Sequence, residues 1–173
     1  NWVIRLQQLT GPAMAKGLED TTFYTWTRFV SLNEVGGNPS RFGIELDEFH
    51  AAMQQRATRW PDALTPTTTH DTKRGEDTRA RLNVLSESPG SWRRATRLWQ
   101  SWNAPLKSTV NGVPAPDAND EYLIYQTLAG TWPLLNSTRP AREYVDRLQA
   151  YHLKAARDAK THTHWIDPNL PYE

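Results

Sequence analysis

The chain has 173 residues, of which 38% are hydrophobic, so it can bury one core of ordinary size. Its 20 basic and 19 acidic side chains give a net charge of +1, which argues against binding to nucleic acid or to an anionic membrane. No apolar run approaches the ~20 residues of a membrane span. The lack of cysteine excludes disulfides and thiolate chemistry, and we expect a cytoplasmic protein.

The first predicted helix is short. Residues 2–9 could form a helix or a strand, and the helix is favoured because Trp2, Leu6 and Leu9 share one helical face; Gly11-Pro12 should end it. The chain opens without a cap or tail and its first methionine is Met14, so we expect it to be a piece of a longer protein.

Two polar groups follow. Lys16, Glu19 and Asp20 precede an aromatic helix, where Asp20 could be a helix cap and Glu19 could pair with Lys16. Further along, Gly36-Gly37 predicts a turn, although adjacent glycines can also let the backbone approach a ligand. Glu34 is the residue of this turn that could reach a ligand hydroxyl.

The next segment alternates a helix, a strand and a loop. Leu46, Phe49 and Met53 form the apolar stripe of a scaffold helix, and the uncharged residues 65–69 predict a short buried strand. A new helix should open after the loop, at about residue 76. Four ionisable side chains lie on the loop: His70, Asp71, Lys73 and Arg74. They suit a site at the end of a strand, although a helix cap beside a solvated charged face is the simpler alternative.

The remainder of the chain predicts helices without strands between them. Their expected spans are 76–87, 89–102, 118–129 with Gly130 as the stop, and a long helix started by Thr138 and Pro140. Trp92, Trp99 and Trp102 share a stripe that we expect to be core. Residues 103–117 predict an irregular connection with a tight turn at Asn111-Gly112.

His162 and His164 are spaced to chelate a transition metal. No third ligand of a suitable type lies near them in the sequence, whereas a catalytic zinc needs three protein ligands. We therefore expect no metal site here, and a substrate or supporting role stays open for this segment.

One motif carries most weight: Thr69-His70-Asp71-Thr72-Lys73-Arg74, followed by Glu76-Asp77 and Arg79-Ala80-Arg81. This motif and several others, in one order, resemble those of the maltooligosyltrehalose synthases, which belong to the α-amylase superfamily (glycoside hydrolase family 13). The others are residues 9–21, 31–37, 119–122 with 126–127, and 154–157 with 163–165. The resemblance covers nearly the whole chain.

The resemblance implies a mainly α fold that contributes to a larger enzyme. The expected fold is part of a (β/α)8 barrel, with one short strand ending near Asp71, and an inserted helical bundle. We expect residues 1–87 to be a partial catalytic-barrel segment with the His-Asp loop, and residues 88–173 to be a helical subdomain.

The resemblance also implies roles for individual residues. Asp71 matches the third carboxylate of the superfamily, which stabilises a cationic, ring-flattened transition state. The residues implied to bind substrate are His70, Lys73, Arg74, Lys16, Glu19, Asp20, Glu34 and His164. The nucleophile and the general acid belong to earlier barrel strands, and no segment here matches their motifs. The chain alone is therefore expected to be inactive, with the remainder of the barrel as its partner.

The implied reaction is an intramolecular transglucosylation. It converts the reducing-end α-1,4 linkage of a maltooligosaccharide into an α-1,1 linkage, as in trehalose, without a redox cofactor or a transferred phosphate. Two alternatives stay open at this point. One is an α-amylase-type hydrolase, and the other is a non-catalytic helical module that binds carbohydrate or another protein.

Overall fold

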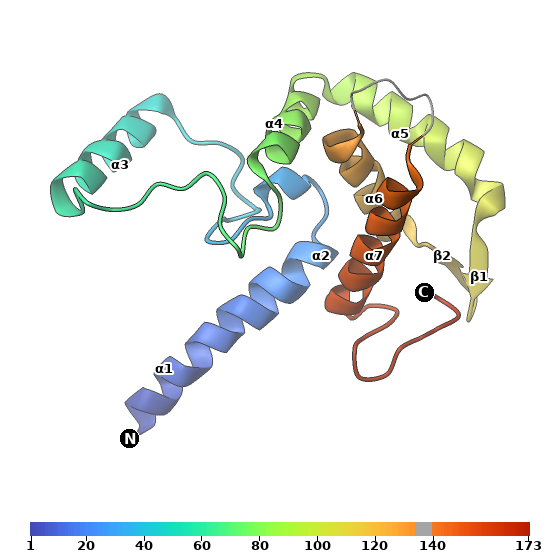
Figure 1. Cartoon of the computed structure of the whole chain (residues 1–173), viewed down its shortest axis with the longest axis horizontal. Coiled ribbons are helices and arrows are strands. Elements are labelled where there is room, and N and C mark those ends of the chain that lie inside the picture. The colour runs from blue at the N-terminus through green and yellow to red at the C-terminus, as the bar shows by residue number, and fades with distance from the viewer. Residues whose placement is uncertain (134–139) are drawn as a thin grey trace.

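The computed structural model describes residues 1–133 and 140–173, and the described chain is mainly helical, as predicted (Figure 1). The α-helices are α1 (Trp2–Pro12), α2 (Phe23–Thr25), α3 (Leu46–Arg59), α4 (Glu76–Val84), α5 (Pro89–Asn103), α6 (Ala118–Thr131) and α7 (Arg142–Ala159). A π-helix spans Ala13–Thr22, and 3-10 turns span Val30–Leu32, Leu85–Glu87 and Ala104–Leu106. The strands are β1 (Ser108–Val110) and β2 (Val113–Ala115).

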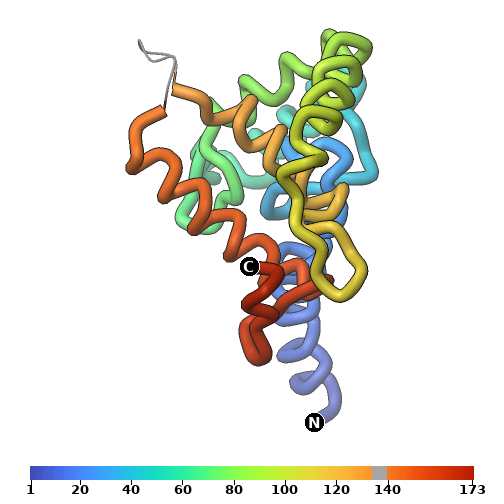
Figure 2. Tube along the Cα trace, turned by 90° about the vertical axis from the view of Figure 1, so that its right-hand side faces the viewer, coloured from blue at the N-terminus to red at the C-terminus, as the bar shows by residue number. Residues whose placement is uncertain are grey.

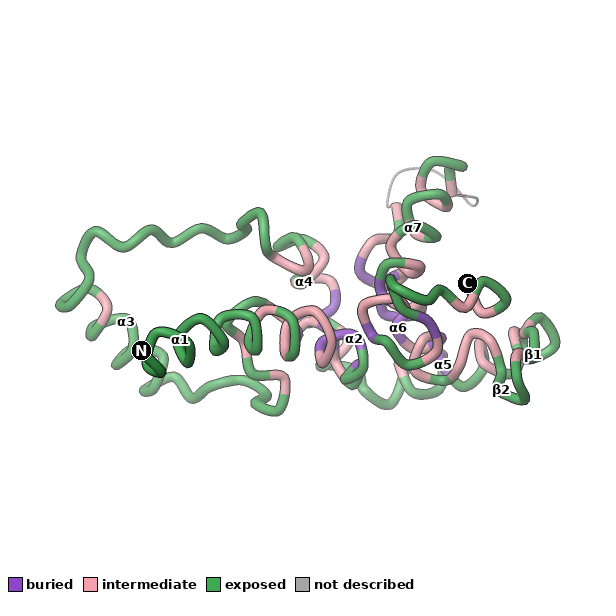
Figure 3. Tube along the Cα trace, turned by 90° about the horizontal axis from the view of Figure 1, so that it is seen from below, coloured by how far each residue is buried: buried purple, intermediate pink, exposed green. Residues whose placement is uncertain are grey.

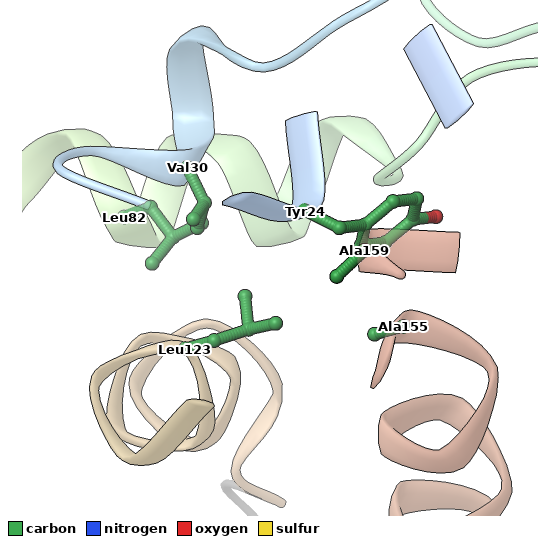
Figure 4. Packing of buried hydrophobic residues seen from close by; sticks show 6 residues of the cluster. All are labelled: Tyr24, Val30, Leu82, Leu123, Ala155 and Ala159. Carbon is green, nitrogen blue, oxygen red and sulfur yellow. The ribbon is translucent and has the colours of Figure 1, made fainter. Parts of the chain in front are cut away.

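The core lies where α2, α4, α6 and α7 meet, and it draws on both halves of the sequence (Figure 4). Its buried apolar residues are Tyr24, Val30, Leu82, Leu123, Ala155 and Ala159. Gln126, also fully buried, accepts a hydrogen bond from the amide of Val30 at 2.9 Å and donates one to the carbonyl of Thr27 at 2.7 Å. The core therefore contains residues from both sides of the predicted boundary near residue 87. The division of the chain into two units at that boundary stays a prediction.

Helix α6 packs closely against α4, and Gly130 permits the approach. A Cβ atom at Gly130 would lie 2.8 Å from the Thr78 methyl group and 3.2 Å from Cγ of Leu82. The prediction that Gly130 ends its helix is wrong, because the helix continues to Thr131. The glycine serves the helix crossing and does not act as a stop signal.

The N-terminal helix also runs further than predicted. Gly11-Pro12 does not break it, and directly after Pro12 the helix widens into the π-helix. The hydroxyls of Thr21 and Thr22 donate to the carbonyls of Lys16 and Gly17, five residues earlier. Such wide turns recur at functional sites, and this one carries three of the predicted site residues.

The strand predicted over residues 65–69 is absent from the structure. These residues are exposed and irregular, and within the described part of the chain the one sheet is the β1–β2 pair. A strand needs a neighbour for its backbone N–H and C=O groups, and no described strand lies beside this segment. Its place in a (β/α)8 barrel therefore remains a prediction. The helix predicted after the loop is confirmed and opens with Glu76 and Asp77.

Residues 108–115 form a hairpin, where the sequence predicted an irregular connection. The predicted turn at Asn111-Gly112 is confirmed: both residues have positive φ, and Val110 pairs with Val113 across it. Asn-Gly is the pair that such two-residue turns favour. Further on, the long helix begins at Arg142, and Thr138 lies outside the described residues.

Two helices project from the core: α1 (Figures 1 and 2) and α3 (Figure 1). Their surfaces are exposed along almost their whole length (Figure 3). The apolar stripe of α3 is at the predicted positions, yet Leu46 is 75% exposed, and on α1 Trp2 is 73% exposed. Trp102 is also exposed, which corrects its placement in the core, whereas Trp92 and Trp99 pack edge to face beside α6. None of the described helices is both long and apolar enough to cross a bilayer.

Candidate active site

His70 and Asp71 lie at the tip of a tight turn between α3 and α4. The hydroxyl of Thr72 closes the turn by accepting from the amide of Thr69 at 2.7 Å and donating to the carbonyl of Thr69 at 2.5 Å. The side chains of His70 and Asp71 are 92% and 73% exposed, with 3.5 Å between Nε2 and Oδ2. The turn therefore presents one carboxylate and one imidazole together to solvent.

The outgoing end of this loop is bound by the carboxylate of Glu34. Oε1 accepts from the amide of Lys73 at 2.8 Å, and Oε2 accepts from the amide of Arg74 at 3.2 Å. Two further donors complete the set: the amide of Val35 at 2.8 Å and Nη1 of Arg79 at 3.1 Å. The structure thus brings Glu34 to the His-Asp loop, where its carboxylate is bound by donors of the chain itself.

Arg79 binds both ends of the loop. Its Nη2 donates to the carbonyl of Thr67 at 2.6 Å, and its Nη1 donates to the carbonyl of Arg74 at 3.1 Å. Arg79 belongs to the motif that follows the loop, but no role was predicted for it. The signal was the spacing: Arg79 sits in the first turns of α4, directly after the loop, where a long side chain can fold back over it.

One ionic network joins the loop to the π-helix through Lys73, Asp20 and Lys16. Asp20 accepts from Lys73 Nζ at 2.9 Å and from Lys16 Nζ at 2.5 Å. Burial alone would raise the pKa of Asp20, but the hydrogen bonds from the two lysines outweigh it and lower the pKa to about 2. Three predicted site residues are therefore joined, and Asp20 does not cap the aromatic helix.

Arg74 turns toward the core. Its guanidinium donates to the carbonyl of Val30 at 3.2 Å and to the hydroxyl of Tyr151 at 2.8 Å. Burial raises the pKa of Tyr151, so this phenol stays protonated and can accept the bond from Arg74. The loop is thereby tied to α7, a contact that sequence reasoning did not anticipate.

Among the described contacts, none joins the remaining two predicted residues, Glu19 and His164, to the His-Asp turn. Glu19 is half-buried on the π-helix and, among the described residues, its carboxylate has no hydrogen-bond or ion-pair partner. His164 is exposed after α7, and its Nδ1 accepts from the amide of Asp167 at 3.1 Å. His162 instead pairs with Asp117 at 2.8 Å, so the two imidazoles are held by different groups.

A cavity of about 460 Å³ lies behind the loop, between α4, α6 and α7. Lys73, Arg74, Tyr144 and Tyr151 contribute to its wall, whereas His70 and Asp71 lie outside it. The exposed turn and the cavity are therefore two separate features. Chemically, the turn offers a carboxylate that can stabilise positive charge. Its exposed side could contact another part of a protein that completes the site.

No family model matches the chain. The protein named "Putative maltooligosyl trehalose synthase" of Mycobacterium tuberculosis (strain CDC 1551 / Oshkosh) is 44% identical over 170 residues, which are 98% of this chain. The chain corresponds to one segment of maltooligosyl trehalose synthase. It spans 21% of the length of this curated relative.

Solved structures of maltooligosyl trehalose synthases contain the same fold. The protein from Arthrobacter ramosus is 45% identical, with a TM-score of 0.80 over 98% of this chain and 20% of that one. A hypothetical maltooligosyl trehalose synthase of Sulfolobus tokodaii is 36% identical, with a TM-score of 0.82 over 98% of this chain and 22% of that one. The family expected from the sequence motifs is therefore confirmed.

Proposed function

We propose that this segment belongs to an enzyme that turns the reducing-end α-1,4 linkage of a maltooligosaccharide into an α-1,1 linkage. The observation that carries the proposal is the position of Asp71. It lies exposed at the tip of a closed turn, within a segment 44% identical to a maltooligosyl trehalose synthase. The reaction is a rearrangement within one glucan chain and consumes no second substrate.

Asp71 is the proposed catalytic carboxylate of the segment. When a glycosidic bond breaks, positive charge develops on the ring, and an ionised carboxylate held at a fixed distance stabilises that state more than the ground state. His70, whose Nε2 lies 3.5 Å from Asp71 Oδ2, would donate a hydrogen bond to the same sugar. Both side chains are exposed, as a substrate contact requires.

The proposed substrate contacts differ in the structural support that they have. Lys16 and Lys73 share Asp20 and can turn their remaining N–H donors toward sugar hydroxyls. Glu19 and His164 stay proposals on motif position alone, because no described contact joins either of them to the turn. The side chain of Arg74 is directed to the core by its bonds to Val30 and Tyr151, so its contribution would be made mainly through the loop.

The site needs further residues to act as a transglucosylase. A retaining reaction uses a nucleophile and a general acid in addition to the third carboxylate, and the proposal assigns these two groups to the remainder of the enzyme. The exposed apolar side chains of α1 and α3 support such a partner, since that surface is suited to burial against other chain segments. The segment alone is accordingly proposed to be inactive. Separately, we propose that the enzyme is cytoplasmic, as the lack of cysteine led us to expect.

The test is to incubate a full-length enzyme that contains this segment with maltopentaose and to follow the number of reducing ends. The proposed rearrangement lowers that number, because both anomeric carbons enter the new linkage. Hydrolysis of the α-amylase type would raise it and would overturn the proposal. Binding of the sugar with an unchanged number of reducing ends would also overturn it, in favour of a non-catalytic module.

A further inference from the structure

We propose that Glu34 and Arg79 are positioning residues that together clamp the two ends of the His70-Asp71 loop. The inference rests on the proposed function for its catalytic consequence, whereas the clamp itself rests on the contacts of the chain. It assigns Glu34 to the loop and withdraws it from the substrate, and it gives Arg79 a role that the motifs alone did not suggest.

The carboxylate of Glu34 has no acceptor site left for a sugar hydroxyl. An ionised carboxylate offers about four lone-pair sites on its two oxygens. The four donors on it are the amides of Val35, Lys73 and Arg74 and the guanidinium of Arg79, at 2.8 to 3.2 Å. The side chain is also only 17% exposed. A sugar could reach it only by displacing donors that would then be left unpaired.

The turn that carries Glu34 is itself fixed to the core. Asn33, fully buried, donates to the carbonyls of Phe23 and Trp26 at 2.8 and 2.7 Å. The amide of Gly37 donates to the carbonyl of Glu34 at 2.7 Å, and a Cβ at Gly37 would lie 2.8 Å from that oxygen. The predicted turn is confirmed, and its glycine is required by this close backbone contact.

Arg79 completes the clamp. It binds the carbonyl of Thr67 before the turn and the carbonyl of Arg74 after it, and it reaches Glu34 with the same guanidinium. A planar guanidinium can hold several acceptors in a fixed arrangement, and bonds to ionised groups are stronger than neutral ones. The two ends of the loop are therefore held at a fixed distance from each other. This fixes the position of the turn that carries Asp71.

The expected consequence is a loss of catalytic rate rather than of substrate affinity. A displacement of about 1 Å at a reacting group can cost on the order of a hundredfold in rate. Neither clamp residue touches the exposed side of Asp71, so sugar binding should be almost unchanged. Glu34→Gln, which keeps the size of the side chain, should lower kcat at least ~10-fold and change KM by less than about twofold.

The test combines kinetics with hydrogen exchange on the full-length enzyme. Glu34→Gln should speed exchange of the peptide covering residues 67–79, because Gln offers one acceptor oxygen in place of two, so that the amide of Lys73 or that of Arg74 loses its acceptor. The peptide covering α6 serves as an internal check and should keep its protection. Asp146→Asn is the matched control, since Asp146 pairs with Arg142 on an exposed surface of α7, and it should change neither exchange nor kcat.

A second variant separates a shared clamp from two independent effects. Arg79→Gln should resemble Glu34→Gln, and the double variant should be little worse than either single one, because both break the same unit. A raised KM with unchanged kcat in Glu34→Gln would overturn the proposal in favour of a sugar contact, and unchanged exchange over residues 67–79 would also overturn it. If the enzyme lacks the rearrangement while exchange speeds up as expected, the clamp stands and the proposed function falls.

Discussion

The Nζ atom of Lys73 lies 2.9 Å from Oδ1 of Asp20, although 53 residues separate the two in the sequence. The contact ties the His-Asp loop to the π-helix, and both side chains are mostly shielded, at 14% and 26% exposed. Lys73 also lies over the ring of Tyr24, 6.0 Å from its centroid. The loop is thus held from the N-terminal helix as well as from Glu34.

Asp20→Asn should lower the free energy of unfolding of the chain in a pH-dependent manner. Burial opposes ionisation, yet the bonds from Lys16 and Lys73 hold the pKa at about 2, below its ordinary 3.8. The contribution of the carboxylate is therefore present above about pH 4 and is lost as the pH falls toward 2. The difference between wild type and variant should be at most about 2 kcal/mol at pH 7 and should close over that window. Urea unfolding at several pH values measures it, and a difference that stays constant to pH 2 would contradict the account.

Gly130→Ala should destabilise the chain by about 1–3 kcal/mol, because overpacking at a close helix contact forces the neighbours apart. The added methyl group would meet the Thr78 methyl at 2.8 Å. Gly11→Ala in α1 is the control, since no atom lies within 4 Å of its Cβ position. It should be neutral or stabilising by up to about 1 kcal/mol. Urea midpoints of the two variants give the comparison, and equal midpoints would show that α4 and α6 do not pack as described.

His152 should titrate far below an ordinary histidine. Burial lowers its pKa to about 4, the positive charge of Arg74 acts in the same direction, and its buried Nε2 has no hydrogen-bond partner among the described residues. Because this pKa lies below the ordinary 6.5, the stability that the neutral ring contributes is full above about pH 6.5 and is lost as the pH falls toward 4.

An NMR titration of the His152 Cε1 proton measures this pKa directly, with His152→Gln to assign the signal. A midpoint near 4 is expected. A midpoint near 6.5 would show that the ring is hydrated and that the packing of α7 against the core is looser than described.

Local signals in the sequence were sufficient for much of the helical fold. The apolar spacing of α3, the acidic first turn of α4 and the Asn111-Gly112 turn are all properties of short segments, and each predicted element is present. The predictions that Gly130 and Pro12 end their helices were wrong for one reason. Both residues usually end helices in isolation, and here a close helix crossing and a widened helical turn accommodate them.

The candidate site was only partly predictable. Its residues could be chosen by motif, but three of the four donors to Glu34 come from residues 39 to 45 positions away, and no local pattern specifies such contacts. The same is true of Arg74 and Tyr151, which are 77 residues apart. The buried strand expected before Asp71 failed for a related reason, because a strand is defined by a neighbour that lies elsewhere in the chain.

The most direct test of the account is the number of reducing ends left by the full-length enzyme acting on maltopentaose, with wild type and Asp71→Asn side by side. The substitution keeps the shape of the side chain and removes the charge, so folding should be preserved. We expect the wild type to consume reducing ends and the variant to do so at least about a hundredfold more slowly, a barrier increase of ~3 kcal/mol. Full activity in the variant would contradict the role of Asp71, and a rise in reducing ends would contradict the rearrangement itself.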